Sequence, residues 1–429
     1  MNAIKALTSA LQSDCGIFEC IMELSEKKQR MLVFLCWLVY TAAYCGRYGY
    51  NANINFVISD FGVTHAEAGL VATLFFFAYG AGQVVNGILC RYYNKRYVLG
   101  GALFVSAGIN LAVFFSAGFA SWKYLWLVNG FVQSVLWSSL VLVLGRNLSP
   151  HNFEKAVFAM STTTAAGTFL SYGCSALFAL FGGYKYTFLF GGALLIAVAA
   201  VWVCFYGAVT LKNLPEEHKP ENEERAEKTL RRGVYLVAGM LAVFAVVNNL
   251  VKDGLTTWAP SILKETYHLS DSLSIFITLF LPVLGVFGAT LAVLLNRKIK
   301  NLIVLSSAMF FAVFLLALAV ALFASAGVIA ASACFVLISA LASAINNIIT
   351  SVAPFYYRDN VNPGTLSGVL NGFCYVGSTV SSYGLGAVAD GYGWTGVFAL
   401  FAVLSFAMAL FGGASEGVKK FCGRRRRER

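Results

Sequence analysis

The chain contains 429 residues, of which 59% are hydrophobic and only 12% are charged, and its formal net charge is +11. This composition excludes a soluble globular protein, in which about a quarter of the residues are normally charged. Apolar runs of the roughly 20 residues needed to cross a bilayer recur along the sequence. Each such run must be helical, because lipid offers no hydrogen-bond partner to an open backbone. The sequence therefore predicts an all-α membrane protein.

We expect twelve transmembrane helices in two groups of six, preceded by a short cytoplasmic segment (1–30). The first group fills residues 31–210, with spans near 31–58, 67–90, 97–118, 122–146, 155–181 and 186–210. A hydrophilic stretch (211–232) is expected to be an exposed cytoplasmic linker. The second group fills residues 233–413, followed by a basic cytoplasmic tail (414–429), with spans near 233–262, 272–295, 300–324, 327–356, 364–389 and 395–413.

The positive charges predict the orientation in the membrane. Most of the 31 Lys and Arg residues lie in the termini, the linker and alternate loops, whereas the intervening loops hold only Lys123, Lys185 and Lys264. Because cytoplasmic loops carry an excess of Lys and Arg, both termini are expected in the cytoplasm. We expect a monomer in the inner or plasma membrane, whose basic loops face anionic lipid and bind no nucleic acid.

The reactive side chains form no recognisable centre. The ten cysteines are scattered, and none forms a Cys-x-x-Cys pair or joins a histidine at metal-ligand spacing. No nucleophile–base set or phosphate-binding loop is visible in the sequence. We therefore expect no disulfide, no metal, no cofactor and no enzyme activity.

The two groups of six helices resemble each other in sequence. A Ser-Tyr-Gly triplet at 171–173 in the fifth span matches one at 382–384 in the eleventh. Two parallel six-helix repeats are typical of the major facilitator fold, in which the substrate site lies near the midplane between the halves. Small residues at four-residue spacing predict close helix packing in the eleventh span, at Gly364, Gly368 and Gly372. The same role is expected in the second span for Gly80, Gly82 and Gly87.

Two cations, Arg47 and Lys252, fall midway along apolar spans, one in each half. A charge at bilayer depth costs roughly 2.5–3.5 kcal/mol, so such residues usually serve a function. Tyr40, Tyr44 and Arg47 share one helix face because they are spaced at i, i+4 and i+7. Since a guanidinium beside two phenols suits an oxyanion, these residues predict a central anion site.

Other spans bring further polar residues to the same depth. Asn248 lies one turn before Lys252, and the tenth span supplies Asn347. A polar group of this kind needs a wet or protein-lined cavity. Gly254 and Pro260 would allow the seventh span to unwind locally.

The alternative for Arg47 is a structural ion pair with Asp253, the sole acid deep in a span. Asp253 is not expected to face its neighbour Lys252, because adjacent helix residues diverge. Proton-coupled carriers usually need a titratable residue in the path. All four histidines are expected in loops, so proton coupling is disfavoured: they are His65, His151, His218 and His268.

The chain resembles the organophosphate:phosphate antiporters of the major facilitator superfamily, which carry glycerol 3-phosphate or hexose phosphates in exchange for phosphate. The resemblance covers most of the chain. The shared motifs are, in chain order, Tyr44-Cys-Gly-Arg47, the Asn-Gly…Gln…Trp run from Asn129 to Trp137, Lys252 before Trp258, the glycines from Gly364 to Gly372 before Tyr375, and Asp390-Gly-Tyr-Gly-Trp394.

The resemblance implies that Arg47 and Lys252 bind a phosphoryl group. It also implies a cavity lined by Tyr40, Tyr44, Tyr79, Trp137 and Tyr375. The glycerol 3-phosphate carriers have a lysine where this chain has Gln83 and a histidine where it has Thr164. With two of the four basic groups missing, a dianion would be less well neutralised. A monoanion, a carboxylate or a sugar-linked ligand is therefore favoured.

The sequence thus predicts a secondary active transporter that moves a small organic anion by alternating access, as an anion exchanger. The expected cargo is an organophosphate, a sugar phosphate or a carboxylate. Two alternatives stay open. The resembling family contains sensor-like members that bind a sugar phosphate outside the cell, and a cation-coupled solute symporter would share the same helical architecture.

Overall fold

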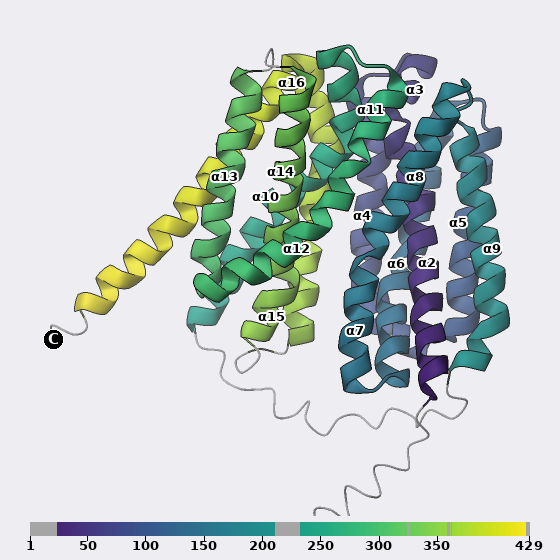
Figure 1. Ribbon diagram of the computed structural model, residues 1–429, viewed down its shortest axis with the longest axis horizontal. Helices are drawn as coiled ribbons and strands as arrows, with labels where there is room; N and C mark the ends of the chain where they lie inside the picture. Colours follow the sequence, from purple (N-terminus) through teal and green to yellow (C-terminus); the bar gives the residue numbers. More distant parts are fainter. Residues whose placement is uncertain (1–23, 211–231, 324–326, 358–360, 362, 426–429) are drawn as a thin grey trace, which may run out of the picture.

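The computed structural model describes residues 24–210, 232–323, 327–357, 361 and 363–425. Within these ranges the chain is helical apart from short turns, and no β-strand occurs. The helices stand side by side in two bundles, α2–α9 and α10–α16 (Figure 1). The predicted all-α fold is therefore confirmed. The expected linker and most of the N-terminal segment lie outside the described residues.

The first bundle is built from long helices joined by short turns. Its helices are α2 (Glu26–Ala52), α3 (Ile54–Phe61), α4 (His65–Leu89), α5 (Lys95–Phe115), α6 (Trp122–Asn147), α7 (Pro150–Ser161), α8 (Thr163–Leu180) and α9 (Tyr186–Val209). Within it, α4 packs on α6, α5 packs on α9, and α2 packs on α8 and α9.

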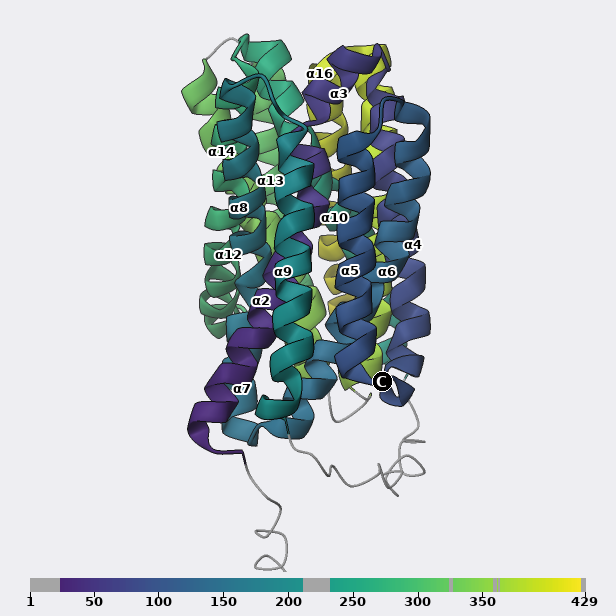
Figure 2. The same cartoon turned by 90° about the vertical axis from the view of Figure 1, so that its right-hand side faces the viewer.

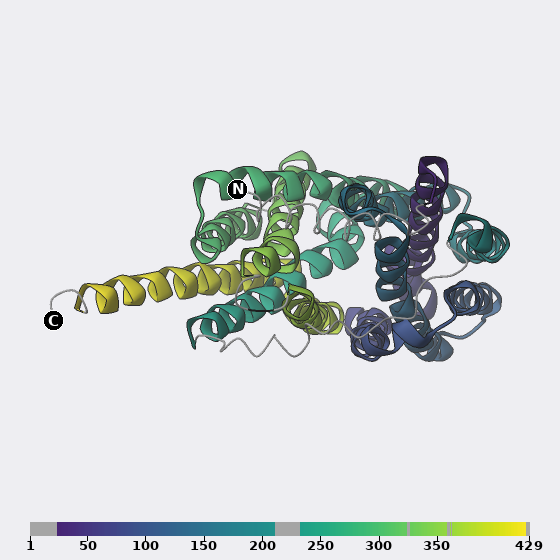
Figure 3. The ribbon, with the colours of Figure 1, turned by 90° about the horizontal axis from the view of Figure 1, so that it is seen from below.

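The second bundle follows a similar plan, with two longer helices, α10 and α16. Its helices are α10 (Arg232–Tyr267), α11 (Asp271–Thr278), α12 (Phe280–Lys298), α13 (Leu302–Leu322), α14 (Val328–Asn347), a π-helical turn η4 (Ile348–Val352), α15 (Ala353–Tyr356) and α16 (Pro363–Arg425). Here α16 packs on α10 and α13, and α12 packs on α14. The last part of α16 leaves the bundle and projects sideways (Figure 3).

Ten segments of the described chain are long and apolar enough to cross a membrane. One of them, Thr365–Gly413, is 49 residues long and kinks at Gly393. The φ angle of Gly393 is 67°, a left-handed conformation that glycine adopts without steric cost. It therefore accommodates the expected eleventh and twelfth spans. The expected fifth span appears as α7 and α8, which meet at Thr162. The described helices thus supply the twelve expected crossings.

Local signals explain where several helices begin and end. Thr64 and Glu67 form a reciprocal capping box at the start of α4. Asn94 accepts a hydrogen bond from the Arg96 backbone at the start of α5. Pro150 occupies the first turn of α7, where its missing N–H costs nothing.

Two local expectations differ from the structure. Helix α10 runs unbroken past Gly254 and Pro260, so the seventh span does not unwind here. The Leu385 side chain fills the space that a Cβ atom at residue 254 would occupy. This tight packing around Gly254 supports the continuous helix.

The predicted glycine face of the eleventh span is also wrong, because nothing lies near Gly368 or Gly372. Close contact on α16 occurs instead at Gly377, against the backbone of Val246, and at Gly386, against the backbone of His65. In the second span, a Cβ would collide with Tyr375 at Gly80 and with Ser134 at Gly82, whereas Gly87 faces open space.

The two bundles meet mainly where α4 packs on α16 and where α8 packs on α11 and α12. In the turned view the first bundle, with α5 and α9, stands in front of the second (Figure 2). One buried apolar cluster belongs to the first bundle and a second to the other. A third cluster joins both bundles, and it includes Phe75 from α4 and Trp258 from α10. This shared core holds together the end of the molecule where α3 and α11 lie.

Candidate functional site

Arg47 lies near the end of α2, inside a shell of aromatic rings. Its guanidinium carbon is 4.0 Å from the centre of the Tyr44 ring, 5.0 Å from Tyr79 and 5.3 Å from Phe75. The residue is only 4% exposed. Its Nε and Nη2 donors are buried and have no hydrogen-bond partner. Because buried polar groups are normally paired, these two donors are available to a ligand.

A small cavity opens beside Arg47. Its lining comes from α2, α4 and α6, and consists of Arg47, Tyr48, Asn51, Ala72, Phe75, Phe76 and Trp126. The rings exclude water and stabilise the guanidinium through cation–π contacts. The result is a cationic donor group in an apolar enclosure, where an anion would interact strongly.

The predicted tyrosines form a network that crosses between the bundles. The Tyr40 and Tyr79 hydroxyls are 3.0 Å apart, and Gln83 donates its amide to Tyr79 at 3.0 Å. The Tyr375 ring from α16 lies 4.9 Å from that of Tyr79. Asn371 donates to the Gln83 carbonyl at 3.0 Å, which links α16 to α4. The structure therefore brings Tyr40, Tyr79, Gln83 and Tyr375 together.

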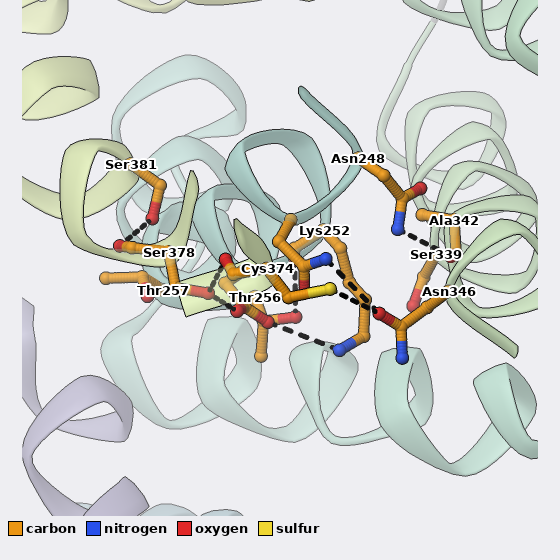
Figure 4. A network of polar contacts seen from close by, with 12 residues as sticks. Asn248, Lys252, Thr256, Thr257, Ser339, Ala342, Asn346, Cys374, Ser378 and Ser381 are labelled. Carbon is orange, nitrogen blue, oxygen red and sulfur yellow. Dashed lines mark hydrogen bonds and ion pairs between the residues drawn. The ribbon is translucent and has the colours of Figure 1, made fainter. Parts of the chain in front are cut away.

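Lys252 has a different setting, shown in Figure 4. Its Nζ lies 3.4 Å from Oδ1 of Asp253 on the same helix. The other carboxylate oxygen of Asp253 accepts a short hydrogen bond from the Ser378 hydroxyl of α16. The expectation that the neighbours Lys252 and Asp253 would diverge is thus wrong, because the long lysine stem brings its ammonium back to the carboxylate. Asp253 pairs with Lys252, and not with Arg47.

The predicted asparagines and threonine have unequal surroundings. Asn248 is fully buried, and its amide donates to the Ala342 carbonyl at 3.0 Å. Asn347 ends α14 and is half-buried, next to the π-helical turn. Thr164 is half-buried on α8, one turn before Gly167, whose backbone touches Tyr44.

Trp137 of α6 contacts Tyr40, with ring centres 5.1 Å apart. Three residues that the sequence analysis did not single out also belong to the site: Tyr48, Phe75 and Ser378. The spacing of Ser378, three residues after Tyr375 on α16, was an available signal. Tyr48 and Phe75 were hidden among the 36 phenylalanines and 20 tyrosines of the chain.

A second polar group, the His65 cluster, lies at the end of the molecule formed by α3 and α11. It consists of His65, Glu265, Asp390 and Trp394. The His65 ring nitrogens lie 2.6 Å from Asp390 and 2.9 Å from Glu265, while Trp394 donates to Glu265 at 2.8 Å. His65 begins α4 and His151 lies in α7, so neither occupies the loop expected for it.

Other hydrogen bonds between the bundles lie between Arg47 and the His65 cluster. The Asn51 amide donates to Thr257, and the Ser261 hydroxyl donates to Asn55, at 2.9 Å and 2.5 Å. Thr73 donates to the Thr379 carbonyl at 2.9 Å. These bonds fasten α2, α3 and α4 to α10 and α16. The bundles are therefore closed on the side of the site where α3 and α11 lie.

Comparison with known proteins places these residues in context. Over 396 residues the chain is 25% identical to the sugar phosphate exchanger 3 of Bos taurus, and the match covers 80% of this chain and 78% of the exchanger. It is 22% identical to a probable hexose phosphate transport protein of Chlamydia pneumoniae over 90% of this chain and 91% of that one. The membrane sensor protein UhpC of Escherichia coli is 32% identical over 113 residues, which span about a quarter of its length.

The fold comparison agrees with the family comparison. A bacterial homolog of the human lysosomal transporter Spinster, solved in an inward-facing and unoccupied conformation, aligns with a TM-score of 0.72 at 13% identity, over 90% of this chain and 97% of that one. The model of the Major Facilitator Superfamily matches residues 36–382, which include Arg47, Lys252 and the tyrosine network. The chain therefore belongs to the Major Facilitator Superfamily.

Proposed function

We propose that this protein is a secondary active transporter that moves a small phosphorylated organic anion, such as a sugar phosphate, by alternating access. The observation that carries the proposal is the buried guanidinium of Arg47, whose Nε and Nη2 donors lack partners. A guanidinium offers the planar fork that matches the oxygens of a phosphoryl group. Two relatives that match over most of their length, a sugar phosphate exchanger and a probable hexose phosphate transport protein, support this cargo.

We further propose that Lys252 joins Arg47 in holding the anion, with Tyr40, Tyr44, Tyr79, Gln83, Trp137, Thr164, Asn248, Asn347 and Tyr375 as the surrounding lining. In the proposed division into halves at 31–210 and 233–413, each half contains one of these cations. An anion held by both cations would draw the halves together. Such closure drives transport only if the ligand binds the conformations unequally.

Exchange is the favoured mode, because an empty site leaves the donors of Arg47 unsatisfied while the halves move. Each unmade hydrogen bond of a charged group costs about 1.5–3 kcal/mol, so crossing without cargo is slowed. We propose a monomer in the plasma membrane with both termini in the cytoplasm. The basic loops support the orientation.

Counterflow in proteoliposomes tests the proposal. Vesicles holding the full chain are loaded with inorganic phosphate or glucose 6-phosphate, and uptake of labelled glucose 6-phosphate is followed. Uptake should be fast from loaded vesicles and slow from empty ones. The alternative is a receptor, for which the match to a membrane sensor over a quarter of its length gives only partial support. Binding of glucose 6-phosphate without flux would favour that receptor and contradict the transporter.

A further inference from the structure

We infer that Asp253 is a specificity-determining residue that sets the charge of the ligand, so that the site accepts one net negative charge and a phosphate ester binds as its monoanion. This inference rests on the proposed function. It deepens that proposal by assigning the ionic form of the cargo to one residue. That residue is neither of the two cations that would hold the ligand.

The geometry fixes Asp253 next to Lys252. The residue is 9% exposed, and each of its carboxylate oxygens has a partner, Lys252 on one side and Ser378 on the other. The partner Ser378 comes from α16, so the carboxylate also joins two helices of the second bundle. Asp253 therefore cannot turn away from Lys252 without giving up a buried hydrogen bond.

The charges around the site add up to one positive charge. Arg47 and Lys252 are cations and Asp253 is an anion. Two neighbouring groups, the phenol of Tyr48 on α2 and the thiol of Cys374 on α16, add no charge at pH 7.

The remaining helices packed on α10 add no charge nearby. Helices α13 and α14 and the turn η4 contain no charged residue. Asp271 of α11 is held by Lys264 at 2.9 Å, and Asp390 of α16 lies in the His65 cluster. Asp60 ends α3, where it is exposed.

A buried site tolerates little uncompensated charge, because the interior solvates ions poorly. A monoanion would neutralise a site of charge +1. A dianion would leave one excess negative charge beside Asp253. The sequence departures at Gln83 and Thr164 act in the same direction, because neither residue supplies a further cation.

The inference is tested by measuring the affinity of the purified full chain for two ligands, glucose 6-phosphate and glucose 6-sulfate. Glucose 6-phosphate loses its second proton near pH 6, whereas glucose 6-sulfate is a monoanion at all relevant pH values. Between pH 7 and 8 the affinity for glucose 6-phosphate should fall about tenfold, as expected for one bound proton. The affinity for glucose 6-sulfate should stay constant, which also controls for titration of the protein itself.

The variant Asp253→Asn supplies the decisive comparison. It raises the site to +2, so glucose 6-phosphate should bind it with little change between pH 7 and 8. Asp271→Asn is the matched control, because it removes an aspartate that is paired with Lys264 at the start of α11, away from the site, and it should keep the profile of the native chain.

Three results would overturn the inference. They are constant affinity for glucose 6-phosphate in the native chain, an unchanged pH profile in Asp253→Asn, or a loss of the profile in Asp271→Asn. The first result needs no variant, so it decides the matter even if Asp253→Asn does not fold. Absence of binding of both probes would overturn the proposed function as well, which distinguishes the two failures.

Discussion

Arg47 and Lys252 have the same charge and lie in different bundles, but their surroundings are opposite. Arg47 is enclosed by the rings of Tyr44, Phe75 and Tyr79 and has no carboxylate partner. Lys252 lies against Asp253 and is 27% exposed at its side chain. The donors of the arginine are free for a ligand, whereas those of the lysine are partly engaged.

The difference teaches that counting cations does not measure the charge offered to a ligand. The arginine contributes a full charge with a fixed fork of donors. The lysine contributes a charge that Asp253 has already offset. Arg47 should therefore anchor the anion, while the pair formed by Lys252 and Asp253 should decide which anion is accepted.

The largest effect is expected for Arg47→Ala. It removes two charge-assisted hydrogen bonds worth about 1.5–3 kcal/mol each, so uptake of glucose 6-phosphate should fall more than about a hundredfold. Arg47→Lys is the matched control, since it keeps the charge without the fork, and it should remain about tenfold below the native chain. Uptake is measured in proteoliposomes, and thermal unfolding checks that both variants fold. Unaltered uptake in Arg47→Ala would instead favour a cation-coupled symporter.

A smaller loss, about 10- to 100-fold, is expected for Lys252→Ala, which removes one charged donor and leaves a buried carboxylate unpaired. Adding Asp253→Asn restores the site charge to +1 and should recover about tenfold in uptake. The same addition to Arg47→Ala should recover little, because the fork is still missing. If both double variants recover equally, the two cations are equivalent and the comparison fails.

The smallest effect is expected for Gln83→Lys, which adds a third cation next to Tyr79. Affinity for glucose 6-phosphate at pH 8 should rise about fivefold relative to glucose 6-sulfate, corresponding to about 1 kcal/mol of added attraction. The gain is limited because a lysine cannot accept the hydrogen bond that Asn371 donates to Gln83. Gln83→Met, which loses the same bonds without adding charge, is the control. Equal affinities in both variants would show that residue 83 lies away from the anion.

Much of the fold was predictable, because apolar runs and positive charges are one-dimensional signals. The runs predicted the helices, and the charge count singled out Arg47 and Lys252. The spacing of Tyr40 and Tyr44 on one face was also sufficient to group them. The break of the fifth span at Thr162 was not predictable, since two stacked helices leave the same apolar pattern as one.

Contacts between helices were less predictable, because they depend on how each helix is rotated. The spacing of Gly368 and Gly372 was suitable for packing, but their face points into open space. The bond from Ser378 to Asp253 depends on the register between α16 and α10, which no periodicity determines. The meeting of Lys252 with Asp253 depends on a flexible stem, which rules based on Cβ directions do not cover.

The His65 cluster has a consequence for how the protein responds to acidity. A neutral imidazole carries one N–H, so it can donate to Asp390 or to Glu265 but not to both, whereas an imidazolium donates to both at once. Only the compartment facing this end supplies that proton. Acid in that compartment adds an imidazole bond to the fastening between the bundles, whereas alkali leaves one imidazole bond beside the two that the backbone N–H groups of His65 and Ala66 donate to Asp390. Acidity on that side should therefore favour the conformation in which the bundles are closed at this end.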